Sequence, residues 1–145
     1  MTNNQQMATA IAGIKQRMEQ AALQAGRKPE DVKLLPVTKT KPWEMLKAAY
    51  DLGLSNFGEN YIQGARDKYD ALSAFDISWH FIGHLQSNKA KYAVKMFDLI
   101  HSVDSLSLAE ALNKEAGKIG KVQAILIQVN EGGETSKGGI TPAAT

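Results

Sequence analysis

Lys39 closes the first apolar run of the chain, in a position where a lysine amine can do chemistry. It follows the segment Leu34–Thr38 and is in phase with Leu35 and Val37, so we expect its side chain to point toward a buried face. Burial and the like charge of Lys41 would both lower the pKa of its ammonium group. A lysine held neutral in this way can attack an aldehyde and form a Schiff base. The residues alone leave a second interpretation open, in which Lys39 extends to the solvated rim of the fold.

Short polar residues follow the other apolar runs of the chain. Asn60, His84 and Ser102 stand at the ends of the second, third and fourth runs, and Lys137 lies in a glycine-rich loop after the fifth. If these runs are parallel strands, their carboxyl ends meet at one edge of the sheet, where binding sites of such folds lie. The loop around Lys137 matches no established phosphate-binding pattern, so it is weak evidence for a phosphate site.

The remaining polar residues at these positions have ordinary structural interpretations. Asp104 and Ser105 are suited to cap a helix that begins at residue 106. The three histidines, His80, His84 and His101, lack the spacing of metal ligands, and no acidic residue completes a recognisable set. We therefore expect structural histidines and no metal site.

Alternating elements must position these residues. Five apolar runs start about 22 residues apart and predict strands, and helical patterns separate them. The predicted strands are 33–39, 55–60, 78–83, 99–104 and 122–130; the predicted helices are 7–25, 43–53, 61–69, 85–96 and 106–116. This alternation favours βαβ units and a parallel sheet, although Pro36 is a local objection to the first strand. Either a flavodoxin-like doubly wound sheet or part of a (β/α)8 barrel fits the pattern.

Composition excludes several classes of protein. The chain has 145 residues, of which 43% are apolar and 22% charged, with a net charge of +2 and no cysteine. These values argue against disorder, a disulfide framework and an electrostatic surface for nucleic acid. No run of 18 apolar residues occurs, and the polar start of the chain does not resemble a signal peptide. We expect a cytoplasmic protein with no membrane or nucleic-acid partner.

Four segments taken together resemble the YggS family of pyridoxal 5′-phosphate (PLP) homeostasis proteins. They are Leu34–Pro42, Asn56–Tyr61, Trp79–Lys89 and His101–Ser105, in the family's order and spacing. The resemblance implies an α/β fold, the (β/α)8 TIM-type PLP-binding barrel, similar to the N-terminal domain of alanine racemase. Residues 1–145 would be a single domain that forms about the first five βα units of that barrel, plus an N-terminal helix.

The same resemblance implies residue roles and a function. Lys39 matches the lysine that forms the internal aldimine with PLP, Asn60 matches a residue beside the cofactor, and His84, Ser102 and Lys137 match positions lining the same mouth. Family members carry or buffer PLP without robust turnover, so no catalytic residue is expected. PLP-dependent apoenzymes are the implied partners, and the full-length form is expected to be a monomer. A racemase-like enzyme, which needs a second base that we do not find, and a flavodoxin-like binding module are the alternatives.

This chain departs from the family pattern in three places. Thr38 stands where serine is usual, which keeps the hydroxyl, and Gly138 stands where a serine is usual, which removes one. The later segments that grip the phosphate in the family have no counterpart after Ile140. Thr141 and Pro142 instead indicate the start of a helix. The sequence therefore predicts the leading part of a barrel, with weak affinity for PLP.

Overall fold

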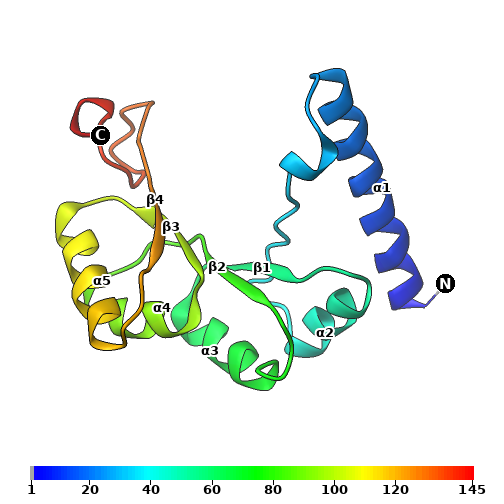
Figure 1. The fold of residues 1–145 in the computed structure, drawn as a ribbon, viewed down its shortest axis with the longest axis horizontal. Coiled ribbons are helices and arrows are strands. Elements are labelled where there is room, and N and C mark those ends of the chain that lie inside the picture. Colours follow the sequence, from blue (N-terminus) through cyan, green and yellow to red (C-terminus); the bar gives the residue numbers. More distant parts are fainter. Residues whose placement is uncertain (1) are drawn as a thin grey trace.

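A parallel sheet of four strands forms the centre of the protein. In the computed structural model, which describes residues 2–145, the strands are β1 (Asn56–Glu59), β2 (Ser78–Phe81), β3 (Leu99–Val103) and β4 (Ala124–Ile127). Each strand pairs with the next one along the chain, in the order β1-β2-β3-β4 (Figure 1). A flavodoxin-like sheet places its first strand between the second and the third. The flavodoxin-like alternative is therefore wrong, and the barrel topology is confirmed.

The helices, apart from the N-terminal one, follow the outer side of this curved sheet (Figure 1). They are α1 (Asn3–Gln24), α2 (Trp43–Asp51), α3 (Ile62–Ala71), α4 (Ala90–Met96) and α5 (Leu106–Lys118), with short 3-10 helices η1 (Pro29–Asp31), η2 (Ser87–Lys89) and η3 (Pro142–Ala144). Figure 1 shows α2 to α5 in succession around one side of the strands, as in a barrel, with α1 set apart beside the β1 end. No helix within residues 2–145 combines the length and apolar character that a membrane span needs.

Local sequence signals set the ends of these helices. Thr2 and Gln5 form a capping box at the start of α1. At its end, Gly26 adopts a φ of 68°, and Arg27 N–H donates back to the carbonyl of Ala22, which closes a Schellman motif. The predicted cap of α5 is confirmed, because the Ser105 hydroxyl accepts a hydrogen bond from the Leu108 amide at 3.2 Å.

The hydrophobic core lies between the sheet and the helices. Alternate residues of β2, Trp79 and Phe81, are buried against the helices, whereas Ser78 and His80, which alternate with them, are half-buried on the opposite face. The rings of Phe81 and Phe97 pack with their centroids 5.1 Å apart. One face of the sheet is thus fixed by packing, and the strand ends are fixed with it.

The first predicted strand is largely absent. Residues 33–39 contribute a single parallel bridge, between Val37 and Gly58, held by hydrogen bonds from Gly58 N–H to the Pro36 carbonyl and from Thr38 N–H to the Gly58 carbonyl. Pro36 has no N–H to donate, so the ladder cannot extend through it. The segment still runs beside β1 and still delivers Thr38 and Lys39 to the carboxyl edge of the sheet.

Candidate functional site

The carboxyl ends of neighbouring strands form one continuous series of contacts. Gly83 packs directly on the backbone of Asn60: a Cβ placed on Gly83 would lie 2.1 Å from the Asn60 carbonyl oxygen. The next residue, His84, has its Nδ1 3.8 Å from Oδ2 of Asp104. A Cβ on Gly138 would in turn lie 3.2 Å from the same Asp104 oxygen. The ends of β1, β2 and β3 and the loop after β4 therefore meet at one rim.

Lys39 lies at the end of the segment beside β1 and is exposed, so the prediction of a buried side chain was wrong. Alternation predicts which residues share a face of the segment, but not whether another element covers that face. Leu35 packs against Gly58, but Val37, two residues later, is 49% exposed. Lys39, two residues after Val37, is exposed as well. The alternative interpretation, a lysine at the solvated rim, describes the observed position.

A buried ionic cluster that sequence reasoning missed lies directly before Lys39. Glu59 is 1% exposed, and its Oε1 accepts hydrogen bonds from Lys68 Nζ at 2.6 Å and from the Thr38 hydroxyl at 2.5 Å. Lys68 Nζ also donates to the Thr38 carbonyl at 2.6 Å. One signal for it existed: Lys68 stands three residues after the fully buried Ala65, on the same face of α3.

Two of the predicted residues carry buried oxygens without a partner. Asn60 Oδ1 and Ser102 Oγ accept or donate no hydrogen bond within residues 2–145. Such an atom costs free energy when its side chain is left unsatisfied. Asn60 is at the rim, one residue after β1, whereas Ser102 is buried inside β3. Asn60 is therefore the better placed of the two to accept a hydrogen bond from a bound molecule.

His84 and Lys137 are both exposed. The side chain of His84 is 72% exposed, and that of Lys137 is 68% exposed and forms an ion pair of 3.0 Å with Glu134. The loop that carries Lys137 is anchored near Asp104 through Gly138. The structure thus brings Lys137 to the same edge of the sheet as His84, with its amine already paired.

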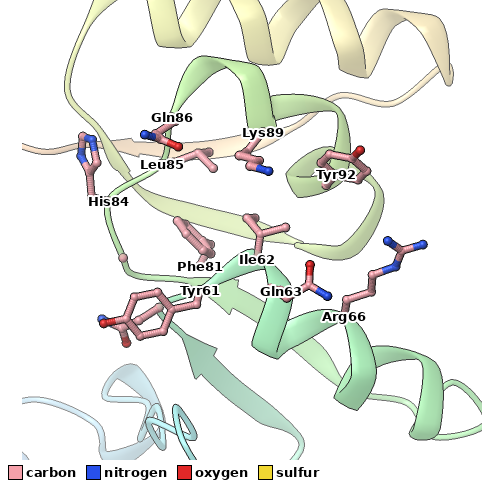
Figure 2. Close-up of a pocket in the computed structure, with 12 residues that line it drawn as sticks. Tyr61, Ile62, Gln63, Arg66, Phe81, His84, Leu85, Gln86, Lys89 and Tyr92 are labelled. Carbon is pink, nitrogen blue, oxygen red and sulfur yellow. The ribbon is translucent and has the colours of Figure 1, made fainter.

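A cavity of about 560 Å³ opens at this rim, between α3 and the η2–α4 segment. Arg66 and Lys89 line it from these two elements, and Phe81 supplies an apolar wall (Figure 2). Asn60 and His84 line it as well. Lys39, Ser102 and Lys137 are not among the described residues that line it, so the cavity unites two of the five predicted residues and not all of them.

Comparison with known proteins agrees with this topology. Residues 11–145 match the family described as alanine racemase, N-terminal domain.

The chain belongs to this family.

Curated relatives match most of this chain. A pyridoxal phosphate homeostasis protein of Aquifex aeolicus is 44% identical over 132 residues, which cover 91% of this chain and 58% of the relative. The protein of the same name from Escherichia coli K12 is 40% identical over 133 residues, covering 90% and 57%. The chain therefore spans somewhat more than half the length of these relatives. The resemblance to the YggS family is confirmed.

Solved structures place the domain in the same fold. PipY of Synechococcus elongatus, solved with PLP bound, has a TM-score of 0.75 and 40% identity, covering 87% of this chain and 58% of that one. A protein from Bifidobacterium adolescentis has a TM-score of 0.83 and 34% identity, covering 99% and 63%. The α/β barrel class is thus supported by topology and by both comparisons.

The inner face of this domain carries a histidine pair. His80 Nδ1 lies 2.9 Å from His101 Nε2, and the Ser78 hydroxyl lies 3.2 Å from His80 Nε2. Burial lowers the pKa of His80, and the charges of His101 and Lys33 lower it further, while Asp98 opposes them. Burial also lowers the pKa of His101. Across residues 2–145, no cluster of three or more His, Cys, Asp or Glu side chains is arranged to hold a metal ion.

These two pKa values predict a pH-dependent stability. Because folding lowers both below the ordinary value of 6.5, the unfolded chain takes up protons first as the pH falls. The contribution to stability is present above pH 6.5 and is lost as the pH falls through the lowered values. We expect the urea midpoint to be lower at about pH 5.5 than at about pH 7.5. His101→Gln should reduce this difference; equal midpoints in the unaltered protein would contradict the prediction.

Proposed function

We propose that this domain binds PLP in a carrier or buffer role, with Lys39 as the residue that bonds the cofactor. The observation that carries the proposal is the exposed amine of Lys39 at the carboxyl edge of a barrel sheet. The names of the relatives, pyridoxal phosphate homeostasis protein, and the neighbour solved with PLP support the choice of ligand. Lys39 would hold the cofactor through a C–N bond formed with loss of one water, since PLP would supply an aldehyde when bound.

The residues present are chemically suited to such a ligand. The amide oxygen of Asn60 is buried without a partner, and Asn60 follows β1, the strand beside the segment that carries Lys39. We propose that His84, Ser102 and Lys137 complete the mouth, with Ser102 contributing its unpartnered hydroxyl.

We further propose that binding is not followed by enzymatic turnover. A racemase needs a base on each face of the substrate Cα, and Lys39 supplies one amine. In the cell we expect a monomeric, cytoplasmic protein that hands PLP to PLP-dependent apoenzymes, with residues 1–145 acting as a single unit of a barrel. Racemisation of a free amino acid at enzymatic rates, measured as product chirality, would overturn the proposal that binding is not followed by turnover.

The covalent role of Lys39 is tested by trapping. The protein is mixed with excess PLP, reduced with borohydride, which supplies a hydride that makes the C–N bond permanent, and digested for mass mapping. We expect pyridoxyl label at Lys39 and its loss in Lys39→Ala, whereas Lys41→Ala, which removes another exposed amine two residues away, should retain it. Undiminished total label in Lys39→Ala would overturn the proposed role.

A further inference from the structure

We infer that the buried ion pair between Lys68 and Glu59 is a positioning device for Lys39: it holds the turn that presents Lys39, rather than Lys41, to the cofactor. This inference rests on the proposed function, because it concerns which amine meets PLP. Neither Lys68 nor Glu59 touches the cofactor in this view. Both act through the peptide of Thr38.

The contacts of the ion pair converge on one residue, Thr38. The Thr38 carbonyl accepts a hydrogen bond from Lys68 Nζ at 2.6 Å, and the Thr38 hydroxyl donates to Glu59 Oε1 at 2.5 Å. Both charged groups are themselves buried, with side chains 9% and 1% exposed. Charge-assisted hydrogen bonds in a buried setting are short and directional. Thr38 is therefore fixed at both its carbonyl and its side chain.

The same carbonyl closes a tight turn around Lys39. Lys41 N–H donates to the Thr38 carbonyl at 3.1 Å, so residues 38–41 form a turn with Lys39 and Thr40 at its corners. Thr40 adopts a φ of 63°, the only non-glycine residue within residues 2–145 in the left-handed region. A β-branched residue is strained there and persists only where its surroundings enforce the conformation.

The backbone ladder alone cannot enforce this turn. The segment before the turn makes two backbone hydrogen bonds to β1. The last of them uses Thr38 N–H, so the pairing with β1 does not reach the Thr38 carbonyl. The Lys68 ammonium is the additional donor that fixes the next carbonyl, and Glu59 balances its charge. A buried ion pair is weak evidence for stability, because apolar residues of similar volume often replace it without loss. Its position at the base of the Lys39 turn supplies the reason for its presence.

The inference predicts selectivity between two neighbouring amines. Lys39 and Lys41 are both exposed and lie two residues apart, so the turn decides which one is aimed at the rim. The measurement is the ratio of pyridoxyl label at Lys39 to label at Lys41 after PLP and borohydride. In the double variant Glu59→Leu/Lys68→Met we expect the ratio to fall at least about ten-fold, because displacing a reacting group by roughly 1 Å can cost up to on the order of a hundred-fold in rate.

Controls separate placement from folding. Lys47→Met/Asp51→Leu removes an exposed ion pair of the same 2.6 Å length on α2, and the ratio should remain that of the unaltered chain. Circular dichroism reports whether each variant folds. If Glu59→Leu/Lys68→Met does not, Thr38→Val against Thr38→Ser decides: the first should lose the selectivity and the second should keep at least half of it.

The outcomes are distinct. A folded double variant, or Thr38→Val, with an unchanged ratio overturns the inference and leaves the role of Lys39 intact. Absence of label at Lys39 in the unaltered chain overturns the proposed function, and the inference with it. A lower ratio in the folded variant with the control unchanged supports both.

Discussion

Gly83→Ala is expected to lower the free energy of unfolding by about 3 kcal/mol, the upper end of the usual cost of overpacking. The added Cβ would lie 2.1 Å from the carbonyl oxygen of Asn60 and 2.7 Å from its carbonyl carbon. These are backbone atoms, so no side-chain rotation can relieve the overlap. Either the end of β1 or the end of β2 must move, and both are anchored by buried Phe57 and Phe81.

Gly64→Ala is the matched control for this substitution. Gly64 lies in α3, and a Cβ placed there meets no atom within 4 Å. Alanine should therefore raise stability by up to about 1 kcal/mol, through the better helix propensity of alanine. Urea unfolding of the two variants and the unaltered protein measures both effects. A Gly83→Ala variant as stable as the unaltered chain would show that the rim can open without cost, contrary to the close contact described.

The order of elements was predictable because it depends on period alone. Apolar runs about 22 residues apart, with helical patterns between them, predict a parallel α/β sheet. The spacing of the apolar runs cannot distinguish a flavodoxin-like sheet from part of a barrel, because the two folds differ in which strands are neighbours. Pairing of Gly58 with both Val37 and His80 decides it, because the first segment and β2 flank β1.

The failures concern the environment of each residue more than its place in the chain. Alternation predicts Lys39 in phase with Val37, but burial of that face depends on elements that pack across it, and Val37 is 49% exposed. The pair of Glu59 and Lys68 was missed for a related reason. Its partners are nine residues apart, on a strand and on a helix, and no short motif records that they meet.

Among the site residues, the sequence located the rim but not the distances within it. Asn60 and His84 line one cavity, as their positions at adjacent strand ends require. Lys137 reaches the same edge through the loop that Gly138 anchors beside Asp104. The function of each as a cofactor contact stays a prediction, which the labelling experiments address for Lys39.

Lys68→Met is expected to cost about 3–5 kcal/mol of stability, because it leaves the carboxylate of Glu59 buried without a counter-charge. Glu59 is 1% exposed, so water cannot replace the lost ammonium group. The Thr38 carbonyl loses a donor at the same time. Thermal or urea unfolding should show the loss directly, as a lower midpoint with an unchanged dependence on denaturant.

A second substitution, at Glu59, tests whether the unpaired charge causes the loss of stability in Lys68→Met. If an uncompensated charge destabilises Lys68→Met, then removing that charge as well, in Glu59→Leu/Lys68→Met, should recover much of the stability although one more native contact has gone. Lys47→Met, which breaks a solvated pair on α2, should cost no more than about 1 kcal/mol. A double variant as unstable as Lys68→Met would instead mean that packing of the Lys68 chain, not its charge, holds α3 to the sheet.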